Sequence, residues 1–243
     1  MLNSKVVDSS AYKAHNEGQN PFSDSYFRKR KETLFTAIAA FIPLRFGIIA
    51  RRFLYISILG KAGKALHTET GIEFHNADLI EVGDGVRIDR DVRIRNVGRC
   101  SKIRLGNRVR ISRGVDIKIH SHPGGELHID DRTTIGPYSC ITGHSIKIGK
   151  SCLIAPHVGI FANNHNFEAR NIFIKDQGHT YRGIVIGDDC WLGSGAKILD
   201  GVTLGRGCVV GAGAIVTKNL PDYAIAVGVP AKIVGYRGEV KPA

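Results

Sequence analysis

The chain of 243 residues lacks a hydrophobic run of the length that crosses a bilayer. In its basic N-terminal part the longest stretch without a charge, residues 33–44, has 12 residues and already contains Pro43, whereas a spanning helix needs roughly 20. The first 25 residues are polar and lack the apolar centre of a secretory signal peptide. We therefore expect a cytoplasmic protein that can lie on a membrane but does not cross it.

Cysteine is scarce, and its spacing indicates no cross-links. The chain has 5 cysteines, without a Cys-x-x-Cys pair or a disulfide pattern. Cys152, Cys190 and Cys208 fall at equivalent small-residue positions of a six-residue repeat, where a thiol is a compact apolar filler. These positions argue against a disulfide-stabilised secreted domain and are consistent with the expected cytoplasmic location.

Acidic residues are almost absent from residues 27–65, which hold nine lysines and arginines against Glu32 alone. Apolar residues are interleaved with these cations, a pattern that suits an anionic membrane surface better than a nucleic acid. We expect one or two amphipathic helices here, interrupted near Pro43 and Gly47. The segment either makes a peripheral membrane contact or packs on the main domain with its charges in solvent.

What the sequence has in abundance is a repeat of six residues. From residue 186 it reads IGDDCW, LGSGAK, ILDGVT, LGRGCV, VGAGAI, VTKNLP. An aliphatic residue opens every block, glycine commonly follows it, and the fifth place is small or β-branched in the first five blocks. Two inward positions and a turn therefore recur every six residues, which predicts a stack of short strands.

The same frame runs backwards to residue 82 and gives eighteen aliphatic openers in all. Every irregular spacing follows a third opener, between residues 94 and 105, 117 and 129, 141 and 148, and 160 and 186. Insertions are tolerated at one corner of a prism, whereas its flat faces must stay in register. The pattern thus predicts an all-β dominated chain, a parallel β-helix of about six three-sided coils with a short amphipathic helical segment before it.

This pattern also divides the chain. We expect a flexible tail at residues 1–26, the basic helical segment at 27–70, the β-helix at 71–219, and a closing strand with a C-terminal tail at 220–243.

The longest interruption, residues 161–185, is too long for an ordinary corner, and loops of this length without a repeat are usually functional. A β-helix alone implies no activity, so function is sought here. The loop contains His165, and imidazole, with a pKa near neutrality, is the usual general base for proton removal. A structural histidine that caps the last strand is the alternative. The preceding Asn163 and Asn164 either contact a substrate or are present because asparagine tolerates left-handed backbone.

Two stretches and the loop between them resemble a known family. They are IGKSCLIAPHVGIFANNHNF and IGDDCWLGSGAKILDGVTLGRGCVVGAGAIVTKNLPDYAIAVGVPAKIVG, with the sequence DQG in the intervening loop. They are similar to the hexapeptide-repeat acyltransferases, in particular to the sugar O-acetyltransferases that include galactoside and maltose acetyltransferases and enzymes that modify bacterial surface polysaccharides. The resemblance covers about residues 148–235. It implies a left-handed β-helix, an exception to the usual crossover rule, and direct transfer of an acetyl group from acetyl-CoA to a sugar hydroxyl with His165 as general base.

The resemblance also implies a coenzyme A site along the side of the β-helix and requires no metal. Trp191, the single tryptophan, falls where the family's tryptophan lines the pantetheine channel, and a packing residue at a subunit contact is the alternative. Lys218 and Lys232 suit the nucleotide phosphates, although ordinary surface lysines are the alternative. Asn163 and Asn164 become candidates for sugar contacts. The positions that match coenzyme A contacts of the galactoside enzyme are Ser194, Ala212, Thr217 and Lys218.

The family's usual assembly is a homotrimer with active sites between neighbouring prisms, which we expect here. Two other functions stay open: an N-acetyltransferase of an amino sugar or antibiotic, which shares the donor site, and a non-catalytic β-helical scaffold. A zinc enzyme of the γ-carbonic anhydrase type needs three converging histidines. His120 and His122 are neighbours in one corner, but His157 and His165 lack that family's spacing.

Overall fold

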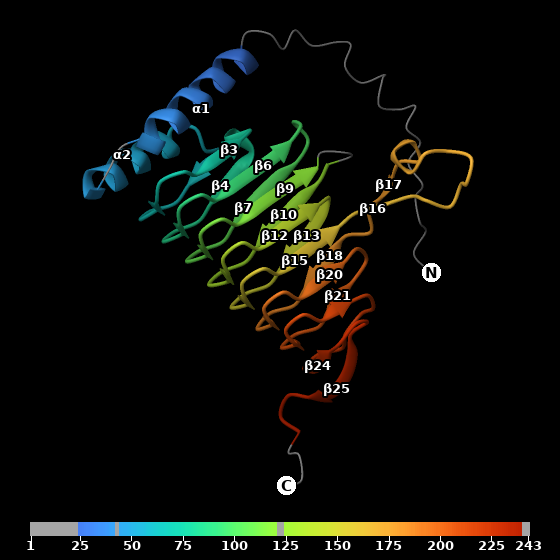
Figure 1. Ribbon diagram of the computed structural model, residues 1–243. Coiled ribbons are helices and arrows are strands. Elements are labelled where there is room, and N and C mark those ends of the chain that lie inside the picture. Colours follow the sequence, from blue (N-terminus) through green and yellow to red (C-terminus); the bar gives the residue numbers. More distant parts are fainter. Residues whose placement is uncertain (1–23, 42–43, 121–123, 240–243) are drawn as a thin grey trace.

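The computed structural model describes residues 24–41, 44–120 and 124–239. Most of its strands form three largely parallel sheets that enclose one narrow core, and the chain visits the three faces in turn (Figure 1). The fold is a parallel β-helix, as the repeat predicted, and it is left-handed, as the family resemblance implied. The flexible tail expected at residues 1–26 falls almost wholly outside the described residues, as does the last part of the C-terminal tail.

The three faces stack in register along the prism. The first face holds β1 (Lys61–Ala62), β4 (Ile80–Val82), β7 (Lys102–Leu105), β10 (Glu126–Ile129), β13 (Ser145–Ile148), β18 (Ile184–Ile186) and β21 (Thr203–Leu204). The second holds β2 (His67–Thr68), β5 (Arg87–Ile88), β8 (Arg110–Ile111), β11 (Thr134–Ile135), β14 (Leu153–Ile154), β19 (Trp191–Leu192), β22 (Val209–Val210), β24 (Ala224–Val227) and β25 (Lys232–Tyr236). The third holds β3 (Glu73–His75), β6 (Arg93–Val97), β9 (Asp116–His120), β12 (Cys140–Gly143), β15 (Gly159–Ala162), β20 (Lys197–Leu199) and β23 (Ile215–Val216).

The core is a column of aliphatic side chains along the axis. All eighteen openers of the six-residue frame are buried, and none has more than 3% of its surface exposed. On the third face Ile94, Ile117 and Ile141 pair in register from one coil to the next. Burying each isoleucine contributes about 1.5–3 kcal/mol. Because every coil covers its neighbour, we expect the prism to unfold as one body.

The prism has seven coils where the sequence predicted about six, and it begins earlier than expected. β1, β2 and β3 form an additional first coil, so the predicted end of the helical segment at residue 70 falls inside the β-helix. The inward positions of this coil are Ala62, Thr68 and Phe74, of which Thr68 is fully buried and Phe74 is 3% exposed. Because none of the three is aliphatic with a branched side chain, the frame did not detect the coil.

Two helices, α1 (Asp24–Phe41) and α2 (Leu44–Ile56), lie across the N-terminal end of the prism (Figure 1). The expected break near Pro43 falls between them, whereas Gly47 lies inside α2 and does not interrupt it. Among the described residues, no helix is long and apolar enough to span a membrane. A short 3₁₀ helix, η2 (Ala77–Leu79), connects the first and second coils.

The helices are anchored to the first coil by charged side chains on their inner sides. The Glu32 carboxylate accepts hydrogen bonds from the backbone N–H groups of Asn76 and Ala77, at 3.2 and 2.8 Å. Burial raises the pKa of Glu32, and these two bonds oppose that rise. On α2 the buried Arg51 donates from Nε to the carbonyl of Thr68 at 3.2 Å. The basic segment is therefore packed on the main domain along one side.

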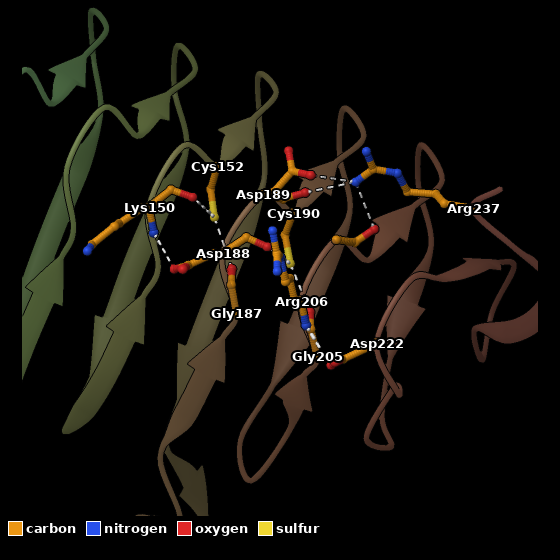
Figure 2. Close-up of polar contacts among 11 residues, drawn as sticks. Lys150, Cys152, Gly187, Asp188, Asp189, Cys190, Gly205, Arg206, Asp222 and Arg237 are labelled. Carbon is orange, nitrogen blue, oxygen red and sulfur yellow. Dashed lines mark hydrogen bonds and ion pairs between the residues drawn. The ribbon is translucent and has the colours of Figure 1, made fainter.

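Polar side chains secure the corner between the first and second faces. The Asp188 carboxylate accepts the backbone N–H of Lys150, and the Asp222 carboxylate accepts that of Arg206, both at 2.8 Å (Figure 2). The same bond recurs at earlier coils, where the accepting side chains are Asp84, Asn107 and Asp131. At these five places a side chain thus holds the turn of the coil before it.

Buried thiols line the same corner from inside. Each lies within reach of a backbone carbonyl of the next coil, as Figure 2 shows for Cys152 and Cys190. The pairs are Cys152 with Gly187, Cys190 with Gly205, and Cys208 with Pro221, at Sγ···O distances of 3.2, 3.2 and 3.1 Å. No more than 1% of any of these three side chains is exposed. The thiols therefore act as weak hydrogen-bond donors as well as fillers, and they are inaccessible to a substrate.

A hairpin, where the sequence predicted a single strand, closes the prism. β24 continues the second face parallel to β22, and β25 turns back antiparallel to β24. Directly after it, Arg237 donates to the Asp189 carboxylate at 2.9 Å and to the Gly207 carbonyl at 3.2 Å (Figure 2). The chain is therefore bonded to the prism as far as Arg237.

Candidate active site

The longest interruption of the repeat folds into a hairpin that projects from the side of the prism (Figure 1). After β15, strand β16 (Asn164–His165) leaves the prism, and β17 (His179–Thr180) returns antiparallel to it. The register places His165 opposite His179. A short 3₁₀ helix, η3 (Ile174–Asp176), lies between the two strands.

Gln177 ties the tip of this loop together. Its side-chain oxygen accepts the N–H of Ala169 at 3.0 Å, and its Nε2 donates to the carbonyls of Ala169 and Ile172 at 2.8 and 2.9 Å. Asn166 donates from Nδ2 to the Gln177 carbonyl at 3.0 Å. The loop thus has hydrogen bonds of its own, which favour a single conformation over a disordered loop with many conformations.

The returning limb of the loop is fixed to the next coil by Asp200. Its carboxylate accepts the backbone N–H groups of Arg182 and Gly183, at 3.0 and 2.9 Å. Burial raises the pKa of Asp200, and the two backbone bonds oppose this. Asp200 therefore determines where the chain re-enters the repeat at β18.

Asp200→Ala is expected to loosen the loop without unfolding the prism. The loss leaves two N–H groups without their charged acceptor, a cost of about 1–3 kcal/mol, and each 1–2 kcal/mol changes the open population by a factor of about 5–30. Limited proteolysis should therefore cut within residues 163–183 several-fold faster. Asp222→Ala is the matched control, because it removes the equivalent acceptor of Arg206 N–H far from the loop. Equal loop cleavage in the two variants would contradict the anchoring role.

The loop joins a group of rings, here called the histidine cluster, at the corner that follows the third face. The ring centroids of His165 and His179 are 4.1 Å apart, those of His144 and Tyr181 5.3 Å, and those of His179 and Tyr181 6.0 Å. The cluster comprises His120 at the end of β9, His144 directly after β12, and His165, His179 and Tyr181 from the two limbs of the loop. Only His165 among them was a sequence candidate for catalysis.

Burial keeps most of the cluster uncharged near neutral pH. It lowers the pKa of His179, and the neighbouring His165 lowers it further. Burial is also the largest cause of the lowered pKa of His120, followed by the charges of Lys118, His179 and His144. Burial raises the pKa of Tyr181, which keeps its proton. The lowered pKa of His179 favours its neutral form, which offers no repulsion to a proton that His165 receives.

His165 itself is positioned by strand pairing and exposed to solvent. Within the described part of the chain its side chain forms no hydrogen bond to a backbone carbonyl. Neither Asn163 nor Asn164 has a positive φ, so tolerance of left-handed backbone does not explain them. Asn164 pairs with Thr180 beside His165, on the surface of the loop.

The candidates for coenzyme A lie on one face and two corners of the prism. Trp191, 53% exposed, stands on the second face between Leu153 and Val209. Ser194 and Ala212 occupy the next corner on successive coils, where the N–H of Gly213 donates to the Ser194 carbonyl at 2.8 Å. The Ser194 hydroxyl donates to the Pro156 carbonyl at 2.9 Å.

The lysine candidates are separated from one another. Thr217 and Lys218 are exposed directly after β23, at the same corner as the histidine cluster but two coils further along. At a strand spacing of about 4.8 Å, this is roughly 10 Å along the prism from β15. Lys232 is exposed on β25 of the second face. One chain thus brings His165 near the corner of Lys218 but not near Trp191 or Ser194.

The described residues contain no group of three or more His, Cys, Asp or Glu side chains that could hold a metal ion. His157 is a turn residue with φ of 61°, and its ring stacks on Tyr138 at a centroid distance of 5.5 Å. His122 lies outside the described residues.

Comparison with known proteins identifies relatives of the repeat region. Residues 183–218 match the bacterial transferase hexapeptide family (six repeats). The galactoside O-acetyltransferase of Escherichia coli is 36% identical over 114 residues, which cover 46% of this chain and 52% of that protein. WbbJ of Escherichia coli, provisionally named a lipopolysaccharide biosynthesis O-acetyl transferase, is 31% identical over 137 residues, 53% of this chain and 70% of the relative. The chain spans about half the length of the curated relatives that it matches first.

A solved structure shares the fold. A single-residue mutant of AntD, an N-acyltransferase from Bacillus cereus in complex with dTDP-4-amino-4,6-dideoxyglucose and coenzyme A, superposes with a TM-score of 0.58. The two are 19% identical, and the match covers 78% of this chain and 90% of that one. At this identity the similarity shows the fold alone.

Proposed function

Because the chain belongs to the hexapeptide-repeat transferases, we propose that it is an acetyl-CoA-dependent O-acetyltransferase that acts on a sugar hydroxyl. The observation that carries the proposal is the loop hairpin, which interrupts the repeat and presents an exposed His165 against His179. Relatives named for galactoside O-acetylation and for lipopolysaccharide biosynthesis support a sugar acceptor. We place the reaction in the cytoplasm, in the synthesis of a surface polysaccharide or glycoconjugate.

In the proposed reaction His165 removes the proton of the acceptor hydroxyl as the oxygen attacks the thioester carbonyl carbon. The carbon–sulfur bond then breaks, and the departing thiolate takes up the proton from His165. The products are an acetyl ester and free coenzyme A, without a covalent enzyme intermediate. The neutral His179 lets His165 carry the proton without repulsion. General base catalysis of this kind is worth about 10²–10⁴ in rate.

The donor is proposed to lie along the second face and the corner that follows it. An extended pantetheine arm fits small residues such as Ala212, where the backbone is open to hydrogen bonding, and the exposed ring of Trp191 gives it an apolar wall. Lys218 and Lys232 supply cations for the phosphates. Since His165 and Trp191 are on different sides of one prism, a site that uses both needs a second chain. We therefore propose a homotrimer with composite active sites.

The test is release of coenzyme A thiol from acetyl-CoA in the presence of a panel of acceptors. The panel contains neutral sugars, nucleotide sugars, oligosaccharides, amino sugars and aminoglycoside-like amines. We expect release that depends on an acceptor with a free hydroxyl, and an ester product by mass spectrometry. A product with an amide bond would show that the protein is an N-acetyltransferase and not an O-acetyltransferase. Absence of release with every acceptor, together with no binding of acetyl-CoA, would leave the non-catalytic scaffold.

A further inference from the structure

The outer faces of the two N-terminal helices carry exposed apolar side chains, here called the apolar ridge. They recur at helical spacing on each helix, so that they lie along one side of it. The ridge consists of Leu34 and Ile38 on α1 and Ile49, Phe53 and Ile56 on α2, which are 56%, 43%, 59%, 71% and 39% exposed. Large apolar side chains exposed in a group, in contrast to single ones, indicate an interaction surface.

The ridge faces away from the prism. The opposite sides of the helices are packed on the first coil, where Ala39 and Tyr55 are fully buried and Arg51 is 3% exposed. Glu32 also points to this inner side, because its carboxylate bonds the turn at Asn76. Figure 1 shows both helices across the end of the prism, so the ridge forms its outer end. The Nζ atom of Lys31 donates to the Ser57 carbonyl at 2.9 Å, which ties α1 to the end of α2.

The helices that carry the ridge are basic. Arg30 and Lys31 are exposed on α1, and Arg52 is half-buried on α2, whereas Lys29 lines the cavity between α1 and the first coil. Among the described side chains of residues 29–65, Glu32 is the single acid, and it is turned inward. Contact between two copies of the ridge would bring like charges together. An anionic lipid surface instead complements both the positive charge and the apolar side chains. We propose that the apolar ridge docks this protein on an anionic lipid bilayer.

Docking through this end determines the height of the candidate active site, and this step rests on the proposed function. Four strand spacings separate β3 from β15, the strand from which the histidine loop leaves the prism. At about 4.8 Å each they amount to roughly 19 Å, and the helix layer adds to it. The acceptor is then a lipid-linked glycan whose modified sugar lies well above the membrane, not the sugar next to the lipid.

Vesicle flotation of the full chain tests the docking. We expect the protein to float with phosphatidylglycerol-containing vesicles at low salt, to float much less with pure phosphatidylcholine, and to be released as salt increases. The fraction of protein bound to anionic vesicles should be at least tenfold lower for the double variant Ile49→Ser/Phe53→Ser than for the parent. Phe173→Ser is the matched control, because Phe173 is 78% exposed in the loop at the side of the prism. It should float like the parent, and thermal melts should show all three proteins folded.

Three results would overturn the docking. The first is that the parent does not float with anionic vesicles, and the second is that the double variant still floats. The third is that the double variant loses flotation but also changes its oligomeric state, which would assign the ridge to contact with a second copy. Turnover is measured separately with water-soluble and lipid-linked acceptors. Absence of turnover with every acceptor, together with no binding of acetyl-CoA, in a protein that floats would reject the proposed function and leave the docking intact. Among lipid-linked acceptors, a preference for the sugar adjacent to the lipid would reject the inferred height.

Discussion

His165→Asn is expected to lower kcat/KM for acyl transfer by about 10²–10⁴, the range for loss of a general base. Asparagine keeps a polar side chain on β16 and the strand pairing with His179, but it cannot accept the proton of the acceptor hydroxyl. Without a base, attack on the thioester must proceed from a protonated hydroxyl. Binding of acetyl-CoA should stay within a few-fold of the parent, because the proposed donor contacts lie elsewhere.

The measurement is release of coenzyme A thiol with the best acceptor, together with calorimetric titration of acetyl-CoA. His75→Asn is the matched control. His75 is an exposed histidine on β3, four strands from β15 on the third face and away from both the loop and the proposed donor site. Activity close to the parent is expected for this control. A His165→Asn protein that retains full acceptor-dependent release would remove His165 from the reaction.

Ile117→Ala is expected to destabilise the protein by about 2–5 kcal/mol. Ile117 is fully buried on β9 between Ile94 and Ile141, so truncation opens a cavity that neighbours held in sheet register cannot fill. Urea unfolding followed by circular dichroism should show a lower midpoint with an unchanged slope. Lys118→Ala, next to it but on the outer side of β9, should change stability by no more than about 0.5 kcal/mol.

The same experiment tests whether the coils form one cooperative body. A single transition, shifted as a whole, is expected from continuous packing along the axis. If Ile117→Ala instead split the transition into two, with the C-terminal coils unfolding at the parent's midpoint, the prism would consist of independent units. If Ile117→Ala lowered the free energy of unfolding no more than Lys118→Ala does, the packing of Ile117 in the core would not contribute measurably to stability.

The sequence predicted the prism because its core obeys a strict local rule. A buried aliphatic residue every six positions leaves a mark that needs no knowledge of distant contacts, and all eighteen predicted positions are in the core. The first coil escaped detection because its inward positions do not hold the Ile, Leu or Val of the repeat. They hold Ala62, Thr68 and Phe74. The closing hairpin escaped for a similar reason: the return of β25 along β24 follows no repeat.

The candidate site was predictable only in part. The length of the interruption and its histidine pointed to His165 as a hypothesis. Nothing local pointed to His179, although both limbs of a loop that leaves and re-enters one corner must run close together, and that was the available signal. His120 and His144 belong to other coils, and only the stacking of successive third-face strands brings them to the same corner.

The sequence by itself determined the repeat, the three-sided section and the place where the repeat stops, because each depends on residues six or eighteen positions apart in one continuous pattern. The tertiary structure alone decided which rings meet His165, how Asp200 and Gln177 fix the loop, and which sides of the basic helices are buried. These depend on contacts between segments that share no spacing in the chain. The apolar ridge is of this second kind, since only the packing of Ala39, Arg51 and Tyr55 on the first coil shows which face is left outside.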